Sequence, residues 1–353
     1  MKMVIYKSFH TIDVDSGQCI RRVIPPDFST FINEYVDYAA QNDSVKYYTI
    51  KSEHTTVVHC IDQLVNDAMA DDGNEEELQF RLNQFSQVIA DKLVSEEQEA
   101  QARIRGTGKR IKKGSLVQAF IKTDDQEHLY IIAKVEHTEY FDGESLEKSF
   151  GFPSEKKNVW KSAVFPLSVE QGVIFDTVRV YTDNDAKYWA AEFLELNETR
   201  NDKDNTSVAY TAIDQELKRR VRKISERDYW ILNNSVYQKM RTQHLLNYPE
   251  MVNELLTGYE AECPELDIES LKTTLLALPT NKNFDTQFNT VPSVLDRKRH
   301  LKYPLMPNIE LRINGTVEDV KGDIVSFTDE QGTRYIKIKC HDTKTYQAFS
   351  SAQ

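Results

Sequence analysis

Basic side chains concentrate in three short windows of the sequence, and contact with phosphate is the chemistry that such windows favour. The first window, residues 102–114, combines arginine, lysine and glycine and contains no acidic residue. Its glycines can expose backbone N–H groups, and its cations can pair with phosphate oxygens. The candidate DNA-contacting residues of this window are Arg103, Arg105, Lys109, Arg110, Lys112 and Lys113. Those of the second window, which also contains Arg220, are Lys218, Arg219, Arg222 and Lys223. Those of the third window, which also contains His300 and Lys302, are Arg297, Lys298 and Arg299.

The alternative interpretation of these windows is a solvated charged face. Its cations would pair with acidic residues elsewhere in the chain, such as those at 75–77. The sequence has no helix-turn-helix, zinc-finger or RNP signature, so base-specific recognition is not indicated.

The glycines of the first window do not form a known nucleotide-binding motif. A P-loop requires a glycine five residues before its Gly-Lys pair and a Ser or Thr after it, and those positions hold Arg103 and Arg110. The dinucleotide fingerprint fails at its third glycine, where the chain has Ile111. No nucleotide cofactor is therefore expected.

The sequence also contains no Gly-x-Ser-x-Gly elbow and no HExxH zinc motif. A carboxylate followed two residues later by lysine, as in some metal-dependent nucleases, occurs at Asp185–Lys187, Glu155–Lys157 and Asp319–Lys321. So short a pattern arises by chance, so we assign no catalytic or metal-binding residue and expect a protein that is not an enzyme. A metal-dependent nuclease stays as a lesser alternative.

The composition limits what the protein can bind. The 353 residues include 44 Lys and Arg against 56 Asp and Glu, a formal net charge of -12, which argues against coating of nucleic acid by bulk charge. The four cysteines are far apart and form no CxxC pair, so free thiols are expected. A secretory signal and a long apolar run are both missing, which predicts a cytoplasmic protein without a membrane anchor.

The elements that must position the basic windows follow from hydrophobic periodicity. Runs of β-forming residues predict strands, and apolar residues at intervals of three and four predict helices. The strands are expected at 4–14, 19–24, 45–50, 116–121, 129–135, 159–167, 172–181, 309–313, 324–327 and 335–340, and the helices at 27–39, 57–69, 75–100, 183–196, 213–224, 229–239, 249–256 and 268–276. This order indicates an α+β fold of mostly antiparallel sheets flanked by helices.

Length predicts two domains, because one core rarely serves so long a chain. We expect an N-terminal α+β domain over 1–181 and a helix-rich domain over 182–353 that ends in β-strands. In the second domain, Ile213, Leu217, Val221 and Ile224 predict a narrow buried stripe, with the basic residues of the second window on the opposite side.

Several segments in this order resemble the bacterial nucleoid-associated protein family typified by YejK, also called NdpA. The similar patches are Tyr47–Glu53, the Glu75–Leu78 helix start, the Leu116–Val135 hairpin, the Ala186–Leu194 helix, Phe284–Leu301 and Ile309–Ile313. The likeness covers most of the chain as an order of segments, without one diagnostic motif. The aromatic side chains Tyr188, Trp189 and Phe193 are interpreted as core residues in preference to a platform for stacking bases.

The resemblance implies association with the nucleoid, binding of double-stranded DNA with little sequence preference, and a homodimer. It carries no set of functional residues, so the DNA contacts named above rest on charge alone. The competing hypothesis is an acidic protein-interaction subunit, an adaptor in a DNA-processing or anti-phage defence complex, because the negative charge suits a basic protein partner.

Overall fold

The computed structural model describes residues 3–70, 74–108, 110–111, 113–141, 148–151, 159–170, 173–184, 187–299 and 301–350. The chain divides into two compact units. The sheet unit comprises Met1–Asn201 and Asp285–Asn289, and the helical unit comprises Asp202–Phe284 and Thr290–Gln353. This division falls after Asn201, whereas the sequence placed the boundary after Tyr181.

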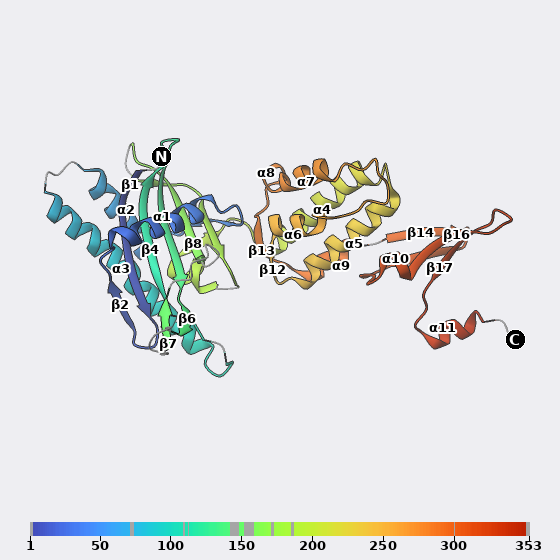
Figure 1. Ribbon diagram of the computed structural model, residues 1–353, viewed down its shortest axis with the longest axis horizontal. Helices are drawn as coiled ribbons and strands as arrows, with labels where there is room; N and C mark the ends of the chain where they lie inside the picture. Colours follow the sequence, from blue (N-terminus) through green and yellow to red (C-terminus); the bar gives the residue numbers. More distant parts are fainter. Residues whose placement is uncertain are drawn as a thin grey trace. The chain divides into compact units, whose positions relative to one another are not determined.

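The sheet unit is built around a large antiparallel sheet (Figure 1). Its elements are β1 (Met3–Asp13), β2 (Gln18–Arg21), α1 (Pro26–Gln41), β3 (Lys46–Ile50), α2 (Thr56–Met69), α3 (Glu75–Arg103), β4 (Gly114–Lys122), β5 (His128–Glu136), β6 (Thr138–Phe141), β7 (Lys148–Gly151), β8 (Val159–Ser168), β9 (Ile174–Phe175), β10 (Val178–Thr182), the π-turn η2 (Trp189–Phe193), β11 (Leu196–Glu198) and β13 (Gln287–Asn289). Within the described residues, the main sheet runs in the order β11-β3-β10-β8-β5-β4-β1-β2, and β9 pairs with β8. The α+β class expected from the sequence is confirmed.

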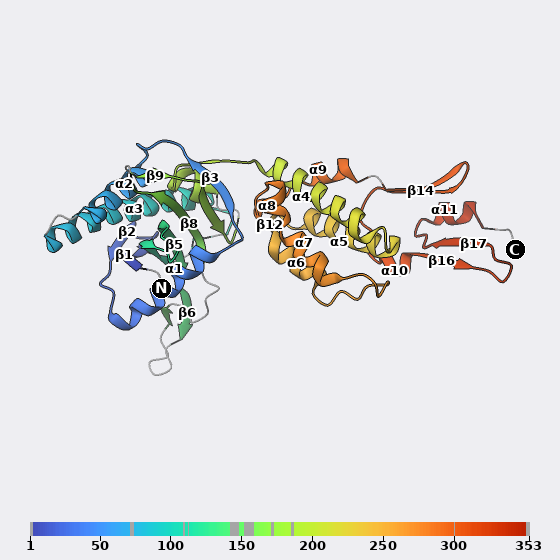
Figure 2. The ribbon, with the colours of Figure 1, turned by 90° about the horizontal axis from the view of Figure 1, so that it is seen from above.

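Helices cover both faces of this sheet, α2 and α3 on one and α1 on the other (Figure 2). Successive side chains of β4 point to opposite faces of the sheet, so this one strand contributes to both hydrophobic cores. Leu116 and Phe120 pack with α2 and α3, whereas Val117, Ala119 and Ile121 pack with α1. The central strands are therefore buried on both faces, mainly through apolar side chains.

The long helix α3 begins where the sequence predicts and leads directly to the first basic window. The Asn74 side chain accepts a hydrogen bond from the Glu77 backbone N–H (3.3 Å), and three glutamates occupy the first turn. Acidic side chains at this end complement the helix dipole. The helix continues to Arg103, so the first basic residue of the window belongs to a helix and not to a loop.

The aromatic segment that was expected as one helix over 183–196 is shorter and ends differently. The described helical structure covers Lys187 and Tyr188, continues as the π-helical segment η2, and gives way to β11, which pairs with β3. Trp189 and Phe193 are fully buried in the core beneath α3, which agrees with their interpretation as core residues. Asp185 and Ala186 lie outside the described residues.

A short segment distant in the sequence, Asp285–Asn289, completes the sheet unit. The carboxylate of Asp285, fully buried, pairs with Arg200 (3.0 Å). The Gln287 side chain donates to the Thr182 carbonyl (2.8 Å) and accepts from the Thr182 N–H (3.0 Å). The Thr286 hydroxyl accepts from the Val45 N–H (2.8 Å). Nothing in the local sequence of this segment predicted this return to the first unit.

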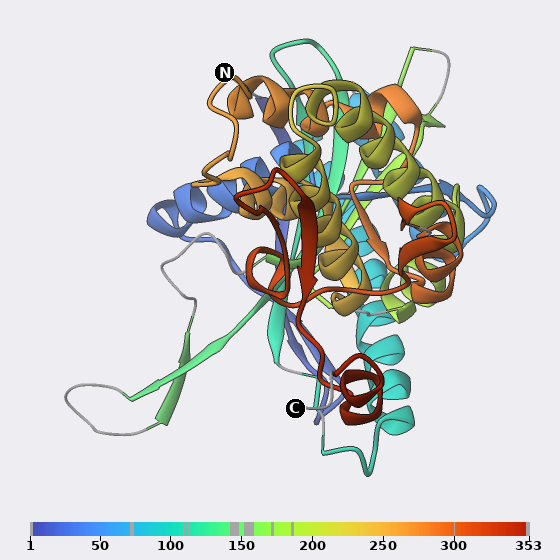
Figure 3. The same ribbon diagram turned by 90° about the vertical axis from the view of Figure 1, so that its right-hand side faces the viewer.

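The helical unit contains short helices followed by two β-hairpins (Figures 1 and 3). Its elements are α4 (Asp202–Glu216), the π-turn η3 (Leu217–Val221), α5 (Glu226–Thr242), β12 (Leu245–Asn247), α6 (Tyr248–Leu256), α7 (Ile268–Leu276), α8 (Leu278–Lys282), α9 (Pro292–Lys298), β14 (Leu301–Met306), β15 (Ile309–Ile313), α10 (Val320–Asp323), β16 (Ile324–Thr328), β17 (Arg334–Ile338) and α11 (Thr343–Ala348). β14 pairs with β15, and β16 pairs with β17.

The predicted apolar stripe of the second basic window is correct up to η3 and wrong after it. Ile213, Leu217 and Val221 are buried, but Ile224 is 46% exposed. A π-helical segment such as η3 adds one residue to a helical turn, so the side chains that follow it rotate away from the expected face. An α-helical period fitted across the turn therefore misplaces Ile224.

All four cysteines are free, in agreement with the expectation of free thiols. Among the described helices, none combines the length and the apolar character that crossing a bilayer would require.

Candidate functional site

The first basic window is partly neutralised at both ends. The Arg103 guanidinium forms a two-pronged ion pair with Glu192, one prong being Nη1 to Oε1 at 2.8 Å. Hydrogen bonding from Arg103 holds the pKa of the Glu192 carboxyl below its usual range. At the other end, the Lys113 ammonium lies 2.9 Å from Asp13 and 3.7 Å from Asp15, and its hydrogen bond to Asp13 raises the pKa of Lys113.

The centre of this window differs from its ends. Arg105 and Arg110 are exposed, and neither forms an ion pair with a described residue. Gly106 (φ 98°) and Gly108 (φ 74°) have left-handed backbone conformations that other residues rarely adopt, and the space where a side chain would begin is open at both. The candidates Lys109 and Lys112 lie outside the described residues.

The second window lies on η3 and the turn that follows it, and its cations pair with acids three or four residues away in the sequence. Lys218 pairs with Asp214 (2.7 Å). Arg219 and Arg220 share Glu216 (2.6 and 3.4 Å). Arg222 pairs with Glu226 (2.8 Å), and Lys223 is exposed without an ion pair to a described residue. Exposed pairs of this kind contribute about 0.3–0.5 kcal/mol each, so solvent and other anions compete for these cations.

The third window is exposed only in part. Arg297 is exposed, but the Lys298 ammonium donates to the Ser207 carbonyl (3.2 Å) and to the Thr211 hydroxyl on α4. Arg299 is only 2% exposed, which contradicts its assignment as a DNA contact. His300 lies outside the described residues, and Lys302 is exposed.

The buried position of Arg299 has a clear physical basis. Its guanidinium lies 4.2 Å from the centre of the Tyr237 ring and donates to Asn234 Oδ1 (2.7 Å). Burial lowers the pKa of Arg299. A guanidinium stacked on tyrosine inside the unit stabilises the packing of α5 and cannot reach a phosphate.

The three windows therefore have different characters. The loop that follows α3 belongs to the sheet unit, whereas the other two windows belong to the helical unit. The loop keeps two unpaired arginines among the described residues, and the second window keeps one unpaired lysine. In the third window, Arg297 and Lys302 are exposed without an ion pair to a described residue. Sequence reasoning found these cations, but it could not identify the acids that partner the rest.

Of the three carboxylate-x-Lys patterns, the one at Asp319–Lys321 lies within the described residues, and its two charged side chains make structural contacts. Asp319 accepts a hydrogen bond from the Gly322 N–H (2.8 Å) and so caps α10, while Lys321 pairs with Glu262 (2.7 Å). Asp185 and the Glu155–Lys157 pattern lie outside the described residues, although Lys187 is described. Within the residues that the structure describes, no group of three His, Cys, Asp or Glu side chains could hold a metal ion.

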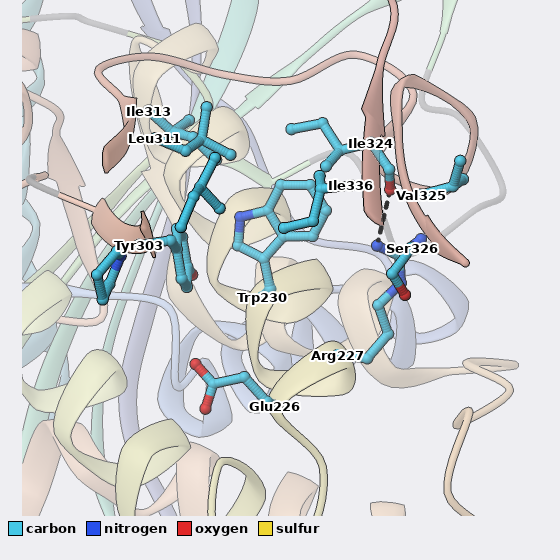
Figure 4. A pocket seen from close by; sticks show the side chains of 12 residues that line it. Glu226, Arg227, Trp230, Tyr303, Leu311, Ile313, Ile324, Val325, Ser326 and Ile336 are labelled. Carbon is cyan, nitrogen blue, oxygen red and sulfur yellow. Dashed lines mark hydrogen bonds between the residues drawn. The ribbon is translucent and has the colours of Figure 1, made fainter. Parts of the chain in front are cut away.

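An apolar pocket in the helical unit was missed by the sequence analysis (Figure 4). It encloses about 420 Å³ between α5 and the two C-terminal hairpins. Trp230 lies at its centre, with Leu311, Ile324 and Ile336 around it, and the Trp230 indole N–H is buried without a hydrogen-bond partner among the described residues. The sequence signal for this pocket was the alternation of apolar residues in the C-terminal strands. Many of these residues had no predicted helix to pack against.

Comparison with known proteins gives no relative. No family model matches the chain, and neither the curated proteins nor the solved structures contain a significant match.

Proposed function

We propose that this protein binds the phosphate backbone of double-stranded DNA with little sequence preference, without being an enzyme, through the loop that follows α3. The observation that carries this proposal is the pair Arg105 and Arg110, exposed and without ion pairs to described residues, beside two glycines with left-handed backbones. Such a loop offers both cations and backbone N–H groups to an anion.

The local charge supports the same proposal. Residues 103–113 contain six basic side chains and no acid. Among the described ones, Arg103 pairs with Glu192, and Lys113 pairs with Asp13 and Asp15. The loop therefore keeps positive charge in a chain whose formal net charge is -12. The helix face Lys218–Lys223 is a weaker second contact, because most of its cations already have helical partners.

The resemblance to nucleoid-associated proteins agrees with this proposal and adds two expectations to it. The first is a location in the nucleoid. The second is a homodimer, which would present the loop twice to one duplex. Two sites on one duplex would raise the overall affinity without new contacts.

The test is fluorescence anisotropy with a labelled duplex at several salt concentrations. For Arg105→Ala/Arg110→Ala we expect weaker binding to all sequences alike and a slope of log affinity against log salt that is smaller by about two, because two phosphate contacts are lost. The matched control is Lys203→Ala/Lys282→Ala, which removes two exposed cations outside the windows. Equal affinity of the arginine variant and the wild type at low salt would reject the loop as the site.

The adaptor hypothesis stays as the second candidate, because the apolar pocket beside Trp230 and exposed apolar side chains on the C-terminal hairpins favour contact with protein. The two functions separate in the same experiment. A purified chain with no affinity for DNA at low salt would favour the adaptor.

A further inference from the structure

Exposed apolar side chains are concentrated near the C-terminal end of the helical unit. Of the nineteen large hydrophobic side chains exposed among the described residues, nine lie within residues 305–349. They are Leu305, Met306, Ile309, Phe327, Tyr335, Ile336, Ile338, Tyr346 and Phe349. So dense a group on the surface marks an interaction site.

The hairpin β16–β17 carries four of these side chains and is poorly covered by the rest of the unit. Every residue of β17 is exposed, and Phe327 stacks on Tyr335 with ring centres 5.0 Å apart. A two-stranded hairpin is marginally stable by itself in water. Further strands or a packed face are what such a hairpin needs.

The backbone of β17 leaves one edge open. The Lys339 N–H donates to the Asp323 carbonyl (2.9 Å), and the Asp329 N–H donates to the Thr333 carbonyl (3.0 Å). These two bonds show which residue pairs of the hairpin are hydrogen-bonded to each other and which are not. In an antiparallel pair with this alternation, the backbone groups of Tyr335 and Lys337 bond to β16, and those at 334, 336 and 338 point outward. No described strand pairs with that outer edge.

The corresponding edge of β16 is different, because it is partly occupied. The Arg227 guanidinium on α5 donates to the Ile324 carbonyl (3.3 Å), as Figure 4 shows. The open edge of the hairpin is therefore that of β17.

We propose that β17 pairs with β17 of a second copy of this chain, antiparallel and about a two-fold axis at Ile336. Residues 334, 336 and 338 would then face 338, 336 and 334 of the second copy, each through its outward backbone groups. In this register Arg334 lies opposite Ile338, and Tyr335 lies opposite Lys337. No like charges are opposed, and each lysine meets an aromatic ring, an arrangement that stabilises strand pairs.

Exposed apolar side chains are available to such a dimer on the paired hairpin itself. They are Phe327, Tyr335, Ile336 and Ile338. Burying them would contribute to the roughly 800 Å² that each partner of a standard stable interface buries. A symmetric contact also suits a surface that a homodimer must use twice.

The first test is the molar mass by light scattering after gel filtration. The wild type is expected at twice the 40.9 kDa of one chain. Ile336→Pro removes an outward N–H without removing a bond of the hairpin, so it should give a monomer. The matched control, Ser326→Pro, removes an outward N–H from the opposite strand and should stay dimeric.

The second test examines the register with two substitutions at one exposed position. Ile338→Glu would place a carboxylate opposite Arg334 of the second copy, and Ile338→Lys would place two cations opposite each other. We expect the dimer dissociation constant of the lysine variant to exceed that of the glutamate variant roughly tenfold at low salt. Equal constants would overturn the two-fold pairing.

This inference adds an interface to the proposed homodimer and rests on it. A wild-type monomer at micromolar concentration would overturn both. A wild-type dimer that Ile336→Pro leaves intact would overturn the interface alone. Neither result bears on the DNA-binding loop, whose variants are measured separately.

Discussion

Single basic residues of this chain have very different surroundings although their sequence contexts are alike. Arg105 is exposed without an ion pair among described residues, Arg103 is held by Glu192, and Arg299 is stacked on Tyr237. Each has basic neighbours in the sequence, so local charge could not distinguish them. The acids and aromatic rings that decide the difference come from elements distant in the sequence, and only the fold brings them together.

A buried histidine gives the residue-scale prediction on stability. His10 on β1 is fully buried, and burial lowers its pKa to about 4 from 6.5. The unfolded chain binds the proton more readily, so this contribution to the free energy of unfolding is complete above pH 6.5 and disappears as the pH falls through 4. The loss should be on the order of 3 kcal/mol.

The measurement is urea unfolding at several pH values between 7 and 4. His10→Phe should reduce the dependence of the unfolding free energy on pH in this window. His54→Gln, at an exposed position, is the control and should leave that dependence as in the wild type. An unchanged slope for His10→Phe would contradict the prediction.

At the scale of elements, hydrophobic periodicity predicted most helices and strands, and it failed where the period itself changes. The hairpin β4–β5 and the helices α2 and α3 lie where their apolar spacing indicated. The π-turns η2 and η3 break the α-helical period, which explains both the shortened aromatic helix and the exposed Ile224. β11 is too short to show the alternation of apolar and polar residues that indicates a strand. It is a strand because it pairs with β3.

An element-scale prediction concerns Asp228, which joins α5 to the segment before α7. Its carboxylate accepts hydrogen bonds from the Tyr259 hydroxyl (2.7 Å) and from the backbone N–H groups of Glu262 (2.9 Å) and Cys263 (3.1 Å). Burial raises the pKa of Asp228, but a hydrogen bond from the Ser225 side chain and these three hydrogen bonds together outweigh burial and lower it overall. Asp228→Asn should reduce the unfolding free energy by about 2 kcal/mol, because one acceptor and the charge are lost.

Hydrogen exchange at the Glu262 and Cys263 amides measures this effect directly, and urea unfolding gives its size. Asp267→Asn is a matched control: Asp267 caps α7 by accepting from Ser270 N–H (2.9 Å), and asparagine caps a helix equally well. If both variants exchange and unfold as the wild type does, Asp228 does not hold the segment.

At the scale of the whole molecule, the net charge of -12 acquires a narrower meaning. Acidic residues pair with six of the thirteen described cations in the three basic windows, and the exposed cations without an ion pair to a described residue are confined to short segments. This distribution fits contact with a duplex at confined places. It does not fit coating of DNA along the surface.

The return of Asp285–Asn289 to the sheet unit gives a whole-molecule prediction. A fragment of residues 1–201 lacks the partners of Arg200, Thr182 and Val45. We expect it to be less stable, by about 4 kcal/mol, than the same fragment with residues 283–291 attached through a flexible linker, since several hydrogen bonds are restored.

Urea unfolding of the two fragments measures this difference. The control is the linked fragment with Asp285→Asn and Gln287→Ala, which should lose most of the gain. Equal stability of the linked and unlinked fragments would show that the segment contributes nothing to the sheet unit.

The same segment also determines when the sheet unit can be completed during protein synthesis. Residues 202–284 must be translated after Arg200 before Asp285 exists to pair with it. At about 5–20 residues per second, this interval lasts roughly 4–20 seconds. The nascent sheet unit must therefore wait on the ribosome, without its last segment, while residues 202–284 of the helical unit are synthesised.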